Sequence, residues 1–284
     1  MLVLCFSLSV IQAQDLTSKK GIPILPEAGE YGLSIDAVPF FEYAGNLFNG
    51  NSFNNAPTWD FPGLGHGNPM FTISGKYFKT ANTAYRGRVR IGYHNETIKN
   101  TLWDQTDTNM VDLKTVEDKW TYSSLDISIG LGIEKRRGKG RVQGIYGAMV
   151  NLSVSTAGNK IKYGNEMSAK YPTPLSTDYP WVEEENGYAT SPASYRVTKD
   201  NDGLTFGIGV NAFVGVEYFF APKMSIGGEF DFGIMFASTG KSKYTVESFD
   251  GTSVKTAETK TGGATHFCID NSNTGGAINL TFYF

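Results

Sequence analysis

The stretch LTFGIGVNAFVGVEYFFAPKMSIGGEFDFGIMF, residues 204–236, holds two runs in which apolar side chains alternate with small or polar ones. Before residues 221–223, every second position from Leu204 to Phe220 is apolar, and a second apolar series ends at Phe236. Period-two alternation is typical of strands, because successive side chains point to opposite faces. Both runs exceed the usual length of about five or six residues, and their second face carries glycines and carboxylates. This pattern predicts a barrel whose outer wall faces lipid.

The rest of the chain repeats this alternation. Six further alternating segments lie at about residues 30–43, 70–79, 85–94, 124–134, 142–154 and 274–284. With the opening pair they make eight predicted strands, joined by links that are alternately long and short. The long links are expected to be loops at about residues 44–68, 96–119, 156–202 and 238–266. In outer-membrane barrels the periplasmic turns are short and the surface loops long. The prediction is therefore an all-β fold, an eight-stranded antiparallel up-and-down transmembrane β-barrel, over residues 30–284.

Residues 1–29 are expected to lie outside the barrel wall. Residues 1–13, MLVLCFSLSVIQA, are apolar and end in small or polar residues, as a secretory signal peptide does, although a basic start is missing. A buried N-terminal strand is the alternative. Residues 14–29 are polar and Pro-rich without periodicity, which predicts a mobile periplasmic lead-in. Cleavage after residue 13 would remove Cys5 and leave Cys268 without an intramolecular disulfide partner.

The composition excludes two classes of protein. The net charge is −3, with 19% charged residues, which argues against a nucleic-acid partner bound through its phosphates. No run of eighteen or more apolar residues occurs in the sequence, so a bundle of membrane-spanning helices is not expected.

Two segments resemble bacterial outer-membrane barrels. The chain ends INLTFYF, residues 278–284, which resembles the terminal strand that the barrel-assembly machinery recognises through a final aromatic residue, here Phe284. Residues 216–229, VEYFFAPKMSIGGE, look like the strand–turn–strand of small Bacteroidota-type outer-membrane β-barrel proteins with OmpA- or OmpX-like architecture. The resemblance implies outer-membrane lipid as surroundings and the bacterial cell outer membrane as location. It leaves function open, because that family includes porins, adhesins, lipid enzymes and accessory subunits.

Charged residues on the predicted inward faces form the first candidate site. An eight-stranded barrel is just wide enough for side chains to fill, and charges buried there must pair. We therefore expect a lumen plugged by ion pairs, with a selective conduction path as the alternative. The predicted lumen charges are Asp36, Lys76, Arg86, Arg88, Arg90, Asp126, Glu134, Glu217, Glu229 and Asp231.

Catalytic, metal and nucleotide sites are not expected. The three histidines, His66, His94 and His266, are scattered, and no Gly-x-Ser-x-Gly signature accompanies them; their separation also makes a poor metal site. The glycine pairs at residues 130–132 and 207–209 lie within predicted strands, so they are not phosphate-binding loops. The prediction is a non-enzymatic chain without a cofactor. The basic run at residues 135–141 is interpreted as a charged periplasmic turn.

The predicted loop at residues 156–202 is the second candidate site. Loops of this length are usually functional or disordered, and this one contains aromatic and proline residues typical of recognition surfaces. Binding of a protein or glycan partner is expected there, the alternative being a loop that only shields the barrel mouth. The candidate residues are Tyr171, Tyr179, Trp181, Tyr188 and Tyr195. The predicted function is surface binding, adhesion or an accessory-subunit role, with a narrow solute-transport barrel or a lipid-modifying enzyme as alternatives.

Overall fold

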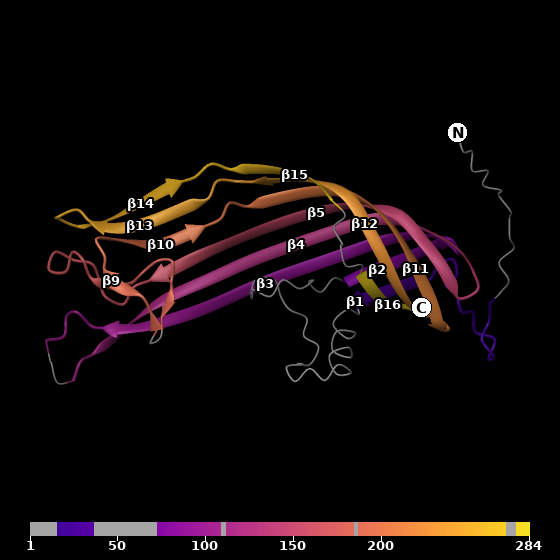
Figure 1. Ribbon diagram of the computed structural model, residues 1–284, viewed down its shortest axis with the longest axis horizontal. Helices are drawn as coiled ribbons and strands as arrows, with labels where there is room; N and C mark the ends of the chain where they lie inside the picture. The colour runs from indigo at the N-terminus through magenta and orange to yellow at the C-terminus, as the bar shows by residue number, and fades with distance from the viewer. Residues whose placement is uncertain (1–15, 37–72, 109–111, 185–186, 271–276) are drawn as a thin grey trace.

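Antiparallel strands make up most of the described part of the chain, in which no helix occurs. The computed structural model describes residues 16–36, 73–108, 112–184, 187–270 and 277–284 (Figure 1). Its strands are β1 (Tyr31–Asp36), β2 (Ile73–Thr80), β3 (Thr83–Trp103), β4 (Thr115–Lys139), β5 (Val142–Lys162), β6 (Leu175–Thr177), β7 (Glu183–Glu184), β8 (Gly187–Tyr188), β9 (Thr190–Pro192), β10 (Tyr195–Asn201), β11 (Thr205–Ala221), β12 (Met224–Thr239), β13 (Lys243–Phe249), β14 (Val254–Lys260), β15 (Ala264–Asp270) and β16 (Ala277–Tyr283). The prediction of an all-β, antiparallel chain is confirmed.

The β11–β12 hairpin has the alternation that the sequence predicted. The two strands pair from Thr205 opposite Thr239 down to Ala221 opposite Met224. Lys223 occupies the tight turn with a φ of 58°. Val214 and Phe230 are 60% and 64% exposed, so the apolar face of the hairpin points out of the molecule.

Successive pairings lead around the molecule and return to their start. From β5 they pass to β11, β12, β16, β1, β2, β3 and β4, which pairs with β5 again. Every one of these pairings is antiparallel. We call this set of strands the ring; its strands curve together at the right of Figure 1.

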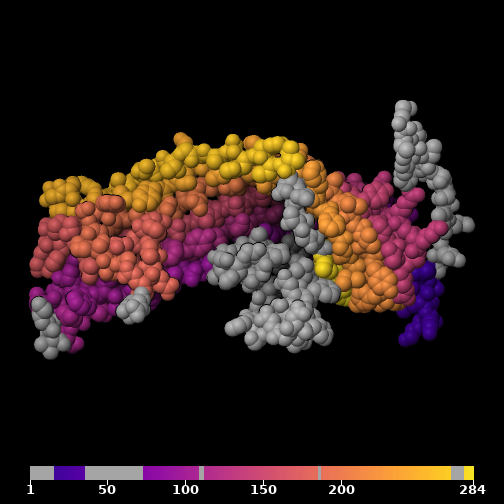
Figure 2. Space-filling view, viewed as in Figure 1, coloured from indigo at the N-terminus to yellow at the C-terminus, as the bar shows by residue number. Residues whose placement is uncertain are grey.

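The ring continues into a sheet that the sequence did not predict. Strands β3, β4 and β5 are 21, 25 and 21 residues long, and their far halves pair on through β10, β13 and β14. We call this part the extension; it runs to the left in Figure 1 and forms one surface with the ring in Figure 2. Strands β6–β9 form two small separate sheets beside it.

The predicted loops at residues 96–119, 156–202 and 238–266 are therefore largely strands. Among the described residues there are sixteen strand elements instead of the eight predicted. The reason is that these segments keep the period of two while their outer face is polar and their inner face carries only scattered apolar residues, such as Ile98 in Thr97-Ile98-Lys99-Asn100-Thr101, so their polarity suggested loops. The predicted loop at 44–68 and the predicted signal peptide at 1–13 lie outside the described residues.

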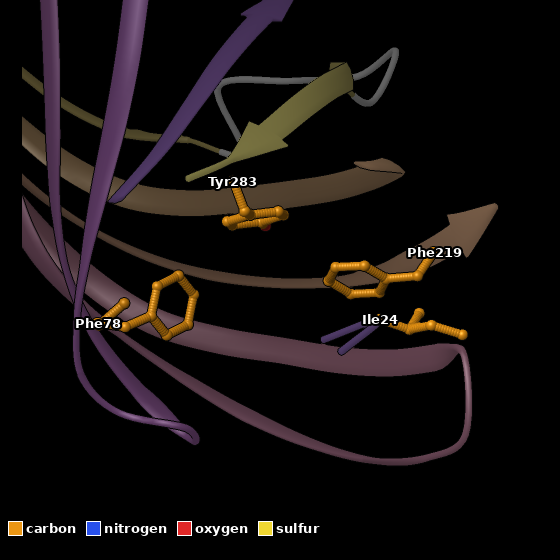
Figure 3. Close-up of a cluster of buried hydrophobic side chains, with 5 residues drawn as sticks. Ile24, Phe78, Phe219 and Tyr283 are labelled. Carbon is orange, nitrogen blue, oxygen red and sulfur yellow. The ribbon is translucent and has the colours of Figure 1, made fainter. Parts of the chain in front are cut away.

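The N-terminal segment is held against the ring, which differs from the mobile lead-in predicted for residues 14–29. Ile24 is only 2% exposed and packs with Phe78, Phe219 and Tyr283 inside the curve of the strands (Figure 3). The Lys223 Nζ donates hydrogen bonds to the backbone oxygen of Leu25, at 3.0 Å, and to the Glu30 carboxylate. One apolar side chain and one ammonium group thus tie this segment to the end of the ring where the turns are short.

Candidate functional site

A network of buried ion pairs occupies the inside of the ring. At its centre, the Glu134 carboxylate lies 2.9 Å from the Lys76 Nζ, 3.2 Å from the Arg136 Nε and 3.6 Å from the Arg86 Nη1. The side chains of all four residues are at most 4% exposed. Each of them lies on the inward face of its own strand; on β4, Glu134 and Arg136 alternate with outward residues such as Ile133.

A second carboxylate, that of Glu217, completes this level of the network. It lies 2.6 Å from the Arg136 Nη2 and accepts hydrogen bonds from the hydroxyls of Ser225, at 2.5 Å, and of Tyr283. The Tyr283 hydroxyl also accepts a hydrogen bond from Arg136. Residues from β4, β11, β12 and β16 therefore meet at one carboxylate, so the network joins strands from across the ring.

The network continues into a second level, formed by Arg86, Arg88, Glu229 and Asp231. Arg86 Nη2 lies 2.7 Å from Glu229, and Arg88 lies 3.0 Å from Glu229 and 3.7 Å from Asp231. The Arg88 side chain is 28% exposed, so it lies at the solvent-accessible end of the network. Buried charges are tolerated when each has a partner, and the network pairs four cations with four carboxylates.

Arg136 is the member that the sequence interpretation missed. The basic run at residues 135–141 was predicted to be a turn, whereas β4 continues through Lys139. The Arg136 guanidinium lies over the rings of Phe78, at 4.5 Å, and Tyr283, at 5.1 Å. The signal was present, because Arg136 follows Glu134 by two positions and so shares its inward face.

Most of the predicted lumen charges lie in this network. Seven of the ten are joined there: Lys76, Arg86, Arg88, Glu134, Glu217, Glu229 and Asp231. Arg90 and Asp126 lie further along the ring, where they line a cavity. The backbone of Asp36 pairs with Asn279, but its side chain lies outside what the structure describes.

That cavity has a volume of about 540 Å³ and lies at the solvent-accessible end of the network. Its polar lining includes Arg88, Arg90, Asp126, Asn151, Asn211 and Asp231. Two buried guanidinium atoms of Arg90, Nε and Nη2, have no hydrogen-bond partner among the described residues. Between the ion pairs themselves the cavity volume falls to about 10 Å³, which is about the least that holds one water molecule. The ring interior is thus roomy at one end and filled at the other.

The aromatic residues predicted to bind a partner pack mainly against the extension itself. Trp181 is 8% exposed, and its ring lies 6.0 Å from that of Trp120 and 5.1 Å from that of Tyr188. The Tyr179 hydroxyl donates a 2.6 Å hydrogen bond to Asp200. Burial first, and then this hydrogen bond, raise the pKa of the Tyr179 phenol above its ordinary value. These three side chains therefore form a small core on the extension, and their binding of a partner stays a prediction.

The remaining two aromatic candidates are more accessible. Tyr195 is 65% exposed, and Tyr171 is half-buried with the Lys170 Nζ 5.0 Å from its ring centre. Neither belongs to the core around Trp181, and only Tyr195 lies in a strand of the extended sheet.

Two buried charged residues that the sequence did not single out, Asp118 and Arg196, hold the segment that follows β5 to the extension. The Asp118 carboxylate accepts hydrogen bonds from the backbone nitrogens of Gly164 and Thr177, at 2.8 and 2.7 Å. Arg196 lies 2.6 Å from Glu247 and donates to the backbone oxygen of Asn165 at 2.7 Å. Nothing in the local sequence distinguished these two from the other charged residues of the predicted loops.

The two histidines that the structure describes lie on different strands. His94 lies 3.7 Å from Glu96, and His266 lies on β15; His66 is outside the described residues. Within the ranges that the structure describes, no three His, Cys, Asp or Glu residues are grouped to bind a metal ion. Those same ranges contain no helix long and apolar enough to cross a membrane.

A scan against protein-family models and a search of the curated proteins gave no match to this chain.

Proposed function

We propose that this chain is an eight-stranded transmembrane β-barrel of a Gram-negative outer membrane that holds a rigid sheet outside the membrane for binding a partner. The cyclic pairing of the ring supports the first part. Backbone groups in hydrocarbon must find partners within the protein, so only helices and closed barrels span membranes. A sheet whose pairings return to their start meets this demand.

The observation that carries the proposal is the inverted polarity of the ring. Its outer surface exposes a belt of large apolar side chains, whereas its interior is ionic. Soluble monomers rarely expose apolar patches larger than a few hundred Å², and lipid is the solvent that suits such a belt. Members of the belt that are at least 43% exposed include Leu33, Tyr85, Val89, Ile91, Ile129, Leu131, Ile133, Val150, Leu152, Phe206, Ile208, Val210, Val214, Val216, Phe230, Phe232, Ile234 and Phe236.

The twelve strands of the large sheet are consistent with eight passes of the chain. Strands β10 and β11 follow each other closely along one edge of β5, and both pair with it. Strands β12 and β13 are likewise consecutive, as are β14, β15 and β16 in the last pass. An even number of passes places both chain ends on one side of the membrane, as in bacterial single-chain barrels.

The extension supports the binding role. A membrane-spanning strand needs roughly 9–11 residues, whereas β4 has 25 residues and a length of about 80 Å at ~3.3 Å per residue. The ion-pair network fills one end of the lumen and closes it to through passage, so a barrel of this shape has its largest accessible surfaces outside the membrane. We place the binding or adhesion function there, in a chain without a catalytic role.

The 540 Å³ cavity favours a second candidate, a narrow barrel that takes up a small solute. Arg90 and Asp126 offer charges of both signs to such a solute. Conductance in planar bilayers distinguishes the two candidates. A wild type that does not conduct, together with a variant that conducts when Glu134 and Lys76 are both replaced by alanine, would support a plugged lumen. A wild type that conducts, with the conductance lost in Arg88→Ala, would support transport.

Membrane fractionation with heat-modifiable gel mobility tests the main proposal. The protein expressed in a Gram-negative host should sediment with outer membranes, resist carbonate extraction, and migrate faster unboiled than boiled. Recovery in the soluble fraction together with a mobility that boiling does not change would overturn the barrel.

A further inference from the structure

One face of the extension sets lysines directly opposite lysines on neighbouring strands. The four opposed pairs are Lys99–Lys119, Lys119–Lys162, Lys160–Lys199 and Lys243–Lys260. Directly opposite residues of an antiparallel pair lie on the same face, with their Cβ atoms about 4.5–5.5 Å apart. We call the surface formed by these seven residues the lysine face; it continues the outward side of the apolar belt along the same strands.

The lysine face keeps most of its charge uncompensated. Glu117 lies 3.1 Å from Lys99 and 3.4 Å from Lys119, and Glu258 lies within 4 Å of Lys243 and Lys260. Among the described residues, no acidic side chain forms an ion pair with the other three lysines of the face. Two glutamates thus face seven lysines in a chain whose net charge is −3.

This arrangement works against the sheet's own stability. Like charges directly opposite each other on neighbouring strands are destabilising, and four such pairs occur on one face. A bound polyanion would relieve the repulsion, because its negative groups would lie between the ammonium groups. The charge pattern is therefore easier to explain by a ligand than by folding.

The other side chains of the face indicate which polyanion fits. Thr97 lies opposite Thr121, which in turn lies opposite Lys160, so hydroxyl groups alternate with ammonium groups. Trp103 lies four residues after Lys99, on the same face of β3, and is 64% exposed. Hydroxyls that hydrogen-bond and an exposed indole that stacks are suited to sugar rings. The strands repeat every ~4.8 Å on a sheet surface, which suits an extended chain with regularly spaced charges.

We infer that the lysine face binds an acidic polysaccharide through its carboxylate or sulfate groups. The inference rests on the proposed function only for its location, since the extension must stand outside the membrane to meet a polysaccharide. The charge pattern itself does not depend on the membrane. Sugar chains carried by lipids of the same membrane, a second copy of this chain and nucleic acid are the other occupants that the test must distinguish.

Binding in neutral detergent tests this inference apart from the membrane proposal. The full chain is titrated with polygalacturonate and with heparin at several salt concentrations, with dextran as an uncharged control. The face variant combines K119Q, K160Q, K162Q and K199Q. The matched control combines K19Q, K20Q, K79Q and K139Q, four exposed lysines at the short-turn end of the ring, so that both variants lose the same charge.

The wild type and the matched control should bind at least one acidic polysaccharide and ignore dextran. The face variant should bind at least tenfold more weakly, with a shallower dependence on salt, because fewer counterions are released. Its thermal unfolding midpoint should not fall, since the substitutions remove repulsion. Equal losses in both variants, no binding to either polysaccharide, or tighter binding to duplex DNA would overturn the inference. A wild type that dimerises through the lysine face and binds no polysaccharide would overturn the inference in favour of a second copy.

These outcomes do not depend on fractionation. A chain that binds the polysaccharide in detergent but is found in the soluble fraction would contradict the barrel proposal and support binding by the lysine face. A chain that fractionates with outer membranes but binds no acidic polysaccharide would support the barrel and contradict binding by the lysine face. Binding that appears only when the chain is reconstituted in vesicles carrying an acidic glycolipid, and not in detergent, would also overturn a free polysaccharide as the occupant.

Discussion

The ring and the extension use the same three strands with opposite polarity. In the ring half of β4, Leu131 points outward and is 67% exposed, while Glu134 is fully buried. In the extension half of the same strand, Lys119 points outward, while Trp120 faces a small aromatic core with Trp181. The change occurs around residues 121–125, where the outward residue passes from Leu125 to Ser123 and Thr121.

Under the proposed function, this contrast means that one sheet is placed in two solvents. A sheet with its apolar face inward suits water, and a sheet with its apolar face outward suits lipid. Period-two alternation produces either, and only the identity of the outward residues decides between them. The predictions that follow change one half while leaving the other as control.

The largest effect is expected in the ring interior. Glu134→Gln would leave Lys76, Arg86 and Arg136 without their shared carboxylate, and breaking a buried ion pair costs about 3–5 kcal/mol. Unfolding by urea in lipid vesicles measures the loss. Glu96→Gln, at a side chain that is 47% exposed, is the control. A loss for Glu134→Gln no larger than the ~0–1 kcal/mol of surface pairs would contradict a desolvated network.

The core of the extension should be the next most sensitive. Trp181→Ala should cost the extension about 3 kcal/mol, as truncation of a buried tryptophan does. Cleavage by protease within residues 163–194 should become faster, while heat-modifiable mobility, a property of the ring, stays. The exposed Trp103→Ala should change neither. Loss of the mobility shift in Trp181→Ala would show that the two halves fold as one unit.

A charge on the apolar belt should cost somewhat less. Leu131→Arg should destabilise the protein in vesicles by about 2–4 kcal/mol if the residue lies near the bilayer midplane. Ser123→Arg, on the same face of the same strand and opposite the uncharged Asn95 and Gly158, should change stability by no more than about 0.5 kcal/mol. Equal effects of the two substitutions would contradict the claim that the ring and the extension lie in different solvents.

The smallest effect concerns the pH dependence of the extension. Because the pKa of Tyr179 is raised on folding, the neutral phenol is favoured in the folded state. Its contribution is fully present below pH ~10, where the unfolded chain also holds the proton, and is lost as pH rises further. Tyr179→Phe should weaken the acceleration of proteolysis between pH 9 and 11. A profile identical to wild type would show that Tyr179 does not report on the extension.

The strand period and the inward charges were predictable from sequence, because alternation places residues such as Arg86 and Glu229 on one face whatever the register. Three features were not. Arg136 was missed because the basic run around it resembled a turn. The extension was missed because its strands are polar on the outer face and only sparsely apolar on the inner face. The burial of Trp181 was missed because it depends on residues 163–194 folding back onto the sheet, a long-range contact without a local signal.

Accessibility of spin labels on β4 tests the central claim most directly. Cysteine is introduced at Leu131 or at Lys119, in a background where Cys5 and Cys268 are serine, and the labelled protein is reconstituted in vesicles. Collisions with oxygen, which is enriched in lipid, should dominate at position 131, and collisions with a water-soluble nickel complex should dominate at position 119. Water-like accessibility at both positions would contradict the account of one sheet in two solvents.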